Sequence, residues 1–289
     1  MKDVYILANI TKQAFHQHQR LEEKEAVSIE LIFLKVDAIR VVHPKIGVRK
    51  MYDIIAQGEM GRDKFEELLL HNGYRVHYPK NYTRTTYSVK CYQYKNLIKG
   101  IELTGINQLW QSDITYFWSG TRFYYLVFII DVYSRRIVGY NASISMETKG
   151  NLNALEMAFK VRRMKNCKGL IHHSDRGSQY ASNAYTKLLE SKKCIISMCD
   201  SAYENAYAER VNGIIKNEYM ANWSCSNLSD IEKWLKRAVD AYNTSRPHNN
   251  LLNKLAPISF EKYILSLSAE KRPKVTIYTE GQKQEVNHE

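Results

Sequence analysis

The chain has 289 residues, with 42 Lys and Arg against 30 Asp and Glu, so its formal net charge is +12. This surplus favours a polyanionic partner such as nucleic acid, although acidic membranes also attract basic proteins. The longest apolar run, 123–130, is too short to cross a bilayer. The five cysteines have no C-x-x-C spacing, which argues against a zinc site or a disulfide framework. We expect a cytoplasmic protein with reduced thiols.

Residues 1–77 are predicted to form a small helical domain. Helices are expected over 25–42, 48–57 and 62–72, and the first is stopped by the His43-Pro44 pair. Two short helices across a glycine-containing turn suggest a helix-turn-helix-like unit. Either DNA binding or plain packing explains such a pair.

A linker is predicted over residues 78–106. It mixes Lys and Arg with five tyrosines, and such a mixture can grip phosphates and stack on bases. A solvated tether explains the same composition equally well.

Residues 107–222 alternate strand and helix. Strands are expected over 109–117, 122–132, 136–145, 169–174 and 194–198, and helices over 149–165, 183–192 and 204–220. The order of three strands, helix, strand, helix, strand, helix is that of a ribonuclease H-like core, an α/β fold with a mixed five-stranded sheet and flanking helices. Residues 223–289 are predicted to add helices over 229–243 and 258–267 and a polar tail, in which 274–279 could form an edge strand.

Three acids occupy positions that this topology brings together. Asp113 lies in the middle of the first strand, Asp175 directly follows the fourth, and Glu209 lies on the last helix. At about 100° per residue, one stripe of that helix carries polar or small residues and the opposite side is apolar. The polar stripe consists of Asn205, Glu209, Asn212, Gly213 and Lys216.

Clustered carboxylates suit phosphodiester chemistry. Mg²⁺ is held by a few carboxylates together with substrate oxygens and water. Two such ions activate the attacking oxygen and stabilise the leaving oxygen. The carboxylates repel one another, so we expect the site to be stable mainly when a metal offsets their charge.

Four segments then resemble the integrase catalytic core: WQSDITY (110–116), DVYSRRIVGY (131–140), HHSDRGSQY (172–180) and ENAYAERVNG (204–213). The chain most resembles the second-frame product of DDE transposases, from bacterial insertion sequences with two overlapping reading frames, which are related to retroviral integrases. The segments HPKIG (43–47) and YNTSRPH (242–248) resemble the flanking parts of that family. The resemblance covers roughly residues 43–260, and it implies a bacterial protein associated with the nucleoid.

This resemblance implies cleavage at the element ends and transfer of the exposed 3′-hydroxyl to another phosphodiester. It implies that Asp113, Asp175 and Glu209 are catalytic and bind Mg²⁺ or Mn²⁺, with two ions expected. It also implies DNA as partner, a homo-oligomer assembled on DNA, and a first-frame partner or fusion supplying an end-binding helix-turn-helix and a coiled coil. Neither of those two elements is convincing in this sequence.

DNA contacts are expected at five further residues: Arg176, Asn205, Asn212, Lys216 and His173. Structural explanations compete with function elsewhere. Asp131 is expected to pair with Arg135 or Arg136, and Arg246 and His248 could pack against the core or touch DNA.

Two alternative functions remain. A hydrolytic nuclease of the same fold would need a fourth acid such as Glu156, which we expect to be a surface charge. A catalytically inactive DNA-binding protein would not need the intact acid triad.

Overall fold

The computed structural model describes residues 11–55, 58, 60–77, 94–200, 202–221, 223, 225 and 227–277. The chain divides into two compact units, 1–77 and 78–289. Most of the predicted linker, 78–93, lies outside the described residues, as do Cys91 and four of the five linker tyrosines.

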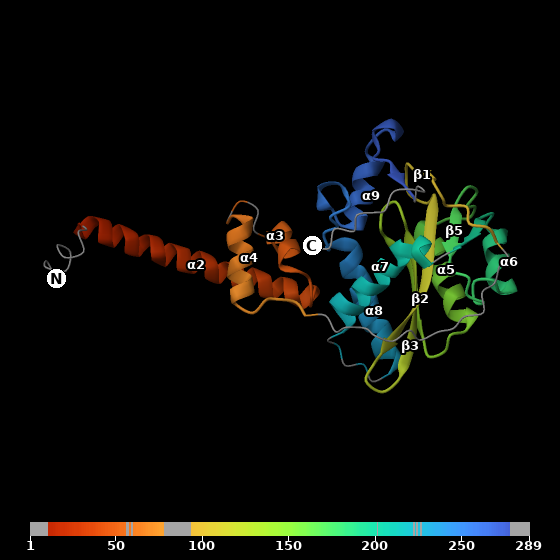
Figure 1. The fold of residues 1–289 in the computed structure, drawn as a ribbon, viewed down its shortest axis with the longest axis horizontal. Coiled ribbons are helices and arrows are strands. Elements are labelled where there is room, and N and C mark those ends of the chain that lie inside the picture. Colours follow the sequence, from red (N-terminus) through yellow and green to blue (C-terminus); the bar gives the residue numbers. More distant parts are fainter. Residues whose placement is uncertain are drawn as a thin grey trace. The chain divides into compact units, whose positions relative to one another are not determined.

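The first unit is helical, as predicted (Figure 1). Its helices are α2 (Lys12–Val42), α3 (Val48–Ile55) and α4 (Arg62–His71). They share a small apolar core that includes Ile32, Met51 and Phe65. A role for the short pair α3 and α4 in DNA binding stays a prediction.

Helix α2 begins 13 residues before the predicted start at residue 25. The hydroxyl of Thr11 accepts a hydrogen bond from the backbone N–H of Ala14, which caps the helix at its true beginning. The prediction missed this start because the residues that follow carry no regular apolar pattern.

The second unit is built on a mixed five-stranded sheet with the order β4-β3-β2-β5-β6. Strands β2 to β4 form an antiparallel meander, and β5 and β6 run parallel to β2. This is the predicted ribonuclease H-like arrangement. The strands are β2 (Leu109–Trp118), β3 (Phe123–Asp131), β4 (Ile137–Ser143), β5 (Ile171–Ser174) and β6 (Ile195–Met198).

Helices cover both faces of this sheet (Figure 1). One apolar core lies under α5 (Thr148–Arg162) and α6 (Asn183–Ser191). The other lies under α7 (Ala206–Ile214), α8 (Leu228–Thr244) and α9 (Pro257–Leu265). Short 3-10 turns occur at Leu252–Lys254 and Ala269–Lys271.

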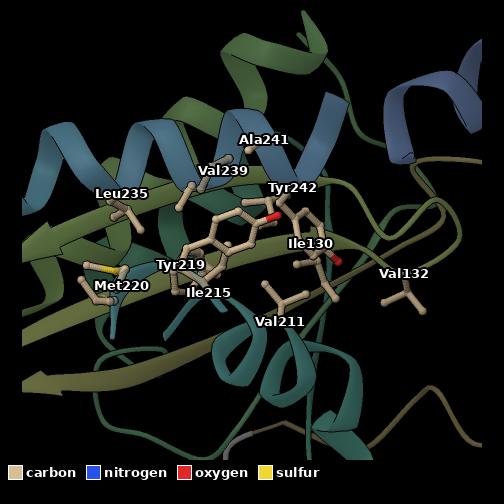
Figure 2. Packing of buried hydrophobic residues seen from close by; sticks show 14 of the residues in the cluster. Ile130, Val132, Val211, Ile215, Tyr219, Met220, Leu235, Val239, Ala241 and Tyr242 are labelled. Carbon is tan, nitrogen blue, oxygen red and sulfur yellow. The ribbon is translucent and has the colours of Figure 1, made fainter. Parts of the chain in front are cut away.

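The helix predicted over 204–220 consists of three segments. A 3-10 turn, η1 (Ala202–Asn205), leads into α7, and α7 continues as a π-helix, η2 (Ile215–Met220). The wider π turn shifts side chains around the axis relative to a regular helix. Figure 2 shows Val211, Ile215 and Tyr219 of this segment facing the apolar cluster to which α8 contributes Leu235, Val239 and Tyr242.

A second, two-stranded sheet pairs β1 (Glu102–Leu103) with β7 (Val275–Thr276) in antiparallel fashion. The edge strand predicted within 274–279 therefore forms over its first part. Its partner lies in the stretch predicted as linker, where Ile98 and Leu103 are buried in the main core. Residues 94–106 are thus part of the folded unit and not a solvated tether.

Two further findings concern membrane spans and the cysteines. Of the helices in the described part of the chain, none is long and apolar enough to span a membrane. The four described cysteines, Cys167, Cys194, Cys199 and Cys225, are buried free thiols.

Candidate active site

Asp113 and Asp175 are brought side by side by the parallel pairing of β2 and β5. The last paired residues of the two strands are Ser112 and Ser174, so the two aspartates follow at equivalent positions. This pairing joins segments about sixty residues apart in sequence. The predicted convergence of the two aspartates at one sheet edge follows from it.

Glu209 comes from the other side of the site, on α7. Its neighbour one turn later, Asn212, donates a hydrogen bond of 2.7 Å from its side-chain amide to Oδ2 of Asp113. The helix that carries Glu209 is thereby tied to the carboxylate on β2. Glu209 itself is exposed, whereas Asp113 and Asp175 are half-buried.

The three carboxylates interact through their charges. Burial, followed by the negative charges of Asp175 and Glu209, raises the pKa of Asp113 well above its usual value. Burial also raises the pKa of Asp175, and burial and the charge of Asp175 raise that of Glu209. The site therefore gathers three acids whose charges act on one another.

The donor set fits a hard divalent cation, because carboxylate oxygens are the ligands that Mg²⁺ and Mn²⁺ prefer. Among the described residues, however, no three His, Cys, Asp or Glu side chains are grouped closely enough to hold one ion. The three acids are therefore close enough for their charges to interact, but their carboxyl groups do not meet at one point. The exposed side chain of Glu209 has room to change rotamer at little cost.

Lys216 supplies positive charge close to the acids. It lies in η2, two turns after Glu209, and its charge lowers the pKa of Asp113. Burial lowers the pKa of Lys216 itself, and the charge of Asp113 opposes that effect. Lys216 therefore stands beside the site, as the polar stripe predicts, and its contact with DNA stays a prediction.

Two buried amides clamp the start of α7 to the strand that carries Asp113. Gln111 donates from Nε2 to the backbone carbonyl of Glu204 at 3.0 Å, and Asn205 donates from Nδ2 to the carbonyl of Ser112 at 2.9 Å. The polar stripe located Asn205, but Gln111 was missed. The alternation of Gln111, Asp113 and Thr115 along one face of the strand is the signal that could have found it.

Asn205 and Asn212 are both buried and bonded within the protein. Their observed role is to position the strand and carboxylate of Asp113. The DNA contacts predicted for them stay predictions.

His173 differs from expectation. It is fully buried, with Nδ1 2.9 Å from the hydroxyl of Ser197 and Nε2 3.1 Å from Sγ of Cys199. Burial lowers its pKa to about 4, so the ring is neutral at physiological pH. The expected DNA contact by His173 is at odds with this placement, since both ring nitrogens face partners inside the protein.

The loop after β5 holds Asp175 in a tight turn. Oδ1 of Asp175 accepts a hydrogen bond of 3.0 Å from the backbone N–H of Gly177. A Cβ at position 177 would lie 3.0 Å from that same oxygen, so a larger residue there would crowd the carboxylate of Asp175. Arg176 pairs with Asp200 at 2.5 Å on the rim of the site, and its predicted DNA contact stays a prediction.

Asp131 has the structural role that was predicted, with a different partner. It is fully buried and pairs with Arg162 of α5 at 3.1 Å, and not with Arg135 or Arg136. It also accepts from the backbone N–H groups of Asn107 and Ser134. The sequence could not reveal Arg162 because the ion pair joins two elements 31 residues apart.

The C-terminal signature packs against the core. Arg246 is buried and forms a bidentate ion pair with Glu218 of η2, at 2.8 and 2.7 Å. The ring of His248 lies edge-on to Tyr242 with centroids 4.7 Å apart. Both residues are thus in the packing role that was one of their two predicted options.

Glu156 is exposed on α5, as expected of a surface charge. The fourth acid that a hydrolytic nuclease of this fold would need is therefore not buried at the site.

Comparison with known proteins bears on the whole chain. Integrase core domain models match residues 104–203 and 193–257. The transposase for insertion sequence element IS904 of Lactococcus lactis is 30% identical over 256 residues, covering 84% of this chain and 98% of that protein. The chain belongs to the insertion-sequence transposases with an integrase core.

Other similar proteins align over different lengths. The 31 kDa protein of insertion element IS600 from Shigella sonnei is 31% identical over 255 residues, 86% of this chain and 92% of that protein. The transposase for IS629 of Shigella sonnei is 42% identical over 142 residues, 48% of this chain, and the match spans about half (47%) of that relative. The magnesium-bound HTLV-2 integrase catalytic core domain aligns with a TM-score of 0.44 and 19% identity, over 58% of this chain and 99% of that domain.

Proposed function

We propose that this transposase cleaves DNA at the ends of its element and transfers the exposed 3′-hydroxyl to a second phosphodiester, using divalent metal at Asp113, Asp175 and Glu209. The observation that carries the proposal is the parallel register that sets Asp175 beside Asp113, with the helix of Glu209 tied to Asp113 through Asn212. Burial, followed by the charges of Asp175 and Glu209, raises the pKa of Asp113 well above its usual value, as expected of neighbouring acids. An acid cluster of this kind within a chain of net charge +12 suits an enzyme that holds DNA around a metal-binding centre.

Each side chain has a defined task in this proposal. Asp113 and Asp175, on neighbouring strands, provide the fixed oxygen ligands, and Glu209 provides an adjustable one from α7. Asn212 donates to one oxygen of Asp113 and so fixes the orientation of this carboxylate. Two Mg²⁺ or Mn²⁺ ions bound there would activate the attacking oxygen and stabilise the leaving one.

The basic residues near the acids would hold the DNA backbone. Lys216 is close enough to lower the pKa of Asp113, so a phosphate at the acids would lie within its reach. Arg176 is a second candidate on the rim of the site. We propose the element ends and a target duplex as substrates, within the bacterial nucleoid, and assembly of several copies on DNA, with or without a first-frame partner.

The test is a joining assay with the purified chain, labelled duplexes from both borders of its element, a target plasmid, and Mg²⁺ or Mn²⁺. Transposase activity predicts 3′-end cleavage followed by joined products, both lost in Asp113→Asn and Glu209→Gln. The matched control is Glu156→Gln, an exposed acid on α5 that should retain full activity.

Other outcomes would point elsewhere. Cleavage without joining, lost in Glu156→Gln, would identify a hydrolytic nuclease. Specific DNA binding without cleavage by the wild type, with either metal, would identify an inactive DNA-binding protein.

A further inference from the structure

Two cations meet at one carboxylate on the rim of the site. Nη2 of Arg176 lies 2.5 Å from Oδ1 of Asp200, and Nζ of Lys99 lies 3.0 Å from Oδ2 of the same side chain. Each oxygen of Asp200 therefore accepts a hydrogen bond from a different cation. The two cations come from distant segments of the chain, which the fold of the second unit brings together.

This cation pair adjoins the proposed metal site. The last paired residues of β5 and β6 are Ser174 and Met198, so Arg176 and Asp200 each lie two residues beyond the end of a strand. Arg176 directly follows Asp175 in the chain. A DNA strand that brings one phosphate to the acids therefore brings its neighbouring phosphates close to Arg176.

Lys99 is held at this rim by contacts other than Asp200. The backbone N–H of Leu97 donates to the hydroxyl of Ser197 on β6 at 2.9 Å, which fixes the segment before the lysine. Nζ of Lys99 also lies 3.4 Å from Oε1 of Glu204, whose side chain is only 5% exposed. The ammonium group therefore keeps its place if Asp200 moves away.

Asp200 is the member of this group that leaves at least cost. Its side chain is 47% exposed, so a rotation about χ1 returns the carboxylate to water with little change in its hydration. Exposed ion pairs also contribute little to stability, because water and salt screen them. The side chain of Arg176 is only 14% exposed, so the guanidinium stays at the rim when the carboxylate leaves.

We propose that Lys99 and Arg176 form a binding site for a phosphate of the DNA backbone, and that the carboxylate of Asp200 occupies this site in the free protein. A phosphodiester, like a carboxylate, presents negatively charged oxygens, and Arg and Lys side chains bind both groups. Bound DNA takes the place of Asp200, whose side chain turns to solvent. The inference rests on the proposed function in taking DNA as the partner, but it needs neither metal nor cleavage.

A purely structural role for these ion pairs makes a different prediction. If Asp200 only fastened the segment after β6, its removal would lower the Tm and leave DNA affinity unchanged. If its carboxylate competes with a phosphate, its removal strengthens DNA binding, whereas removal of the two cations weakens it. The two variants therefore move DNA affinity in opposite directions only when the site binds phosphate.

Fluorescence anisotropy of the full chain with a labelled mixed-sequence duplex, in EDTA and at several NaCl concentrations, tests the site. Lys99→Ala/Arg176→Ala should reduce the slope of log affinity against log salt by about two, because each phosphate contact releases about one counterion. Lys99→Arg/Arg176→Lys keeps both charges and should keep the wild-type slope. Asp200→Asn should bind roughly threefold more tightly than wild type, a gain of the size expected from removing an exposed ion pair.

The matched control is the ion pair of Lys274 and Glu102, which lies in the same unit at 2.8 Å with its acid 46% exposed. Lys274→Ala should keep the wild-type salt slope, and Glu102→Gln should change DNA affinity less than Asp200→Asn does. Should Lys99→Ala/Arg176→Ala fail to fold, Lys99→Ala alone carries the same test with a slope lower by about one.

An unchanged slope in the variants without the cations would overturn the phosphate site, as would a wild type that binds no DNA in EDTA. An Asp200→Asn protein that binds no more tightly than Glu102→Gln would show that the carboxylate does not compete with DNA. Failure here is distinguishable from failure of the proposed function, because the joining assay requires Mg²⁺ or Mn²⁺ and this assay excludes both.

A second duplex identifies the DNA that supplies the phosphate. The same titrations are repeated with a duplex that carries an element end. A loss of slope with this duplex alone assigns the phosphate to the element end, and an equal loss with both duplexes assigns it to any DNA backbone. Either result supports the site formed by Lys99 and Arg176.

Discussion

The side-chain amide of Asn212 donates to Oδ2 of Asp113 across 2.7 Å, which links the helix of Glu209 to the strand of the first aspartate. The two residues are 99 positions apart in the chain. Through this bond the orientation of one acid depends on the placement of the helix that carries another.

Replacing Asn212 by Ala should lower metal affinity and joining activity by roughly 10- to 100-fold, the usual cost of removing a partner that orients a metal ligand. Asn212→Asp should be worse, because it adds a fourth negative charge. The measurement is the Mg²⁺ dependence of joining. Asn153→Ala, an exposed asparagine on α5, should leave that dependence unchanged.

Divalent metal should stabilise the folded protein. The carboxylates repel one another, and burial and its two acidic neighbours raise the pKa of Asp113. At neutral pH, Mg²⁺ should raise the Tm of the wild type, and Asp113→Asn should raise the metal-free Tm while removing most of the response to Mg²⁺. For a domain of this size, each kcal/mol of relief corresponds to about 2–4 °C. A metal-free Asp113→Asn protein less stable than wild type would contradict this account.

Buried His172 should destabilise the protein in acid. Burial lowers its pKa to about 3, and its Nε2 lies 2.9 Å from the hydroxyl of Tyr185. Below the ordinary pKa of 6.5 the unfolded chain binds a proton that the folded chain refuses, so stability is present above that pH and falls as pH drops toward 3. The slope is about 1.4 kcal/mol per pH unit.

Urea unfolding of the wild type and His172→Gln between pH 7 and pH 5 measures this contribution. The variant keeps an acceptor for Tyr185 but cannot take up a proton, so its pH dependence should be shallower by about that slope. Parallel curves for the two proteins would show that His172 does not titrate as stated.

The buried pair of Arg246 and Glu218 should be costly to break from one side. Glu218→Gln or Arg246→Met alone leaves an uncompensated charge, for which about 3–5 kcal/mol is the usual penalty. The double variant Glu218→Gln/Arg246→Met should recover much of that loss. Denaturant unfolding of the four proteins gives the coupling energy, and strictly additive losses would show that the two side chains act independently.

Lys216→Ala should weaken DNA binding and reduce the slope of log affinity against log salt by about one, because one phosphate contact releases about one counterion. Filter binding or fluorescence anisotropy at several salt concentrations measures the slope. The control is Lys187→Ala, which changes a lysine of α6 and should leave the salt slope unchanged. An unchanged slope would remove Lys216 from the DNA interface.

Local pattern was enough to order the elements. The alternation along 109–117 predicted the strand that holds Asp113, within a residue or two of the observed boundaries of β2. The helical stripe of 204–220 placed Glu209 on a helix, which is α7 in the structure. Periods of 2 and 3.6 residues depend only on neighbours in sequence, so a single chain reveals them. The same reasoning failed at the start of α2, where polar residues carry no period.

Tertiary structure decided which side chains became partners. Only the parallel register of β5 on β2 sets Asp175 beside Asp113, and only packing buries His173 against Ser197 and Cys199. Asp131 likewise forms its ion pair with Arg162 on α5 and not with the arginines close to it in sequence. The sequence therefore determined the order of the elements and the position of each acid along the chain. The interaction partners of these side chains depend on contacts between distant segments, which no local period encodes.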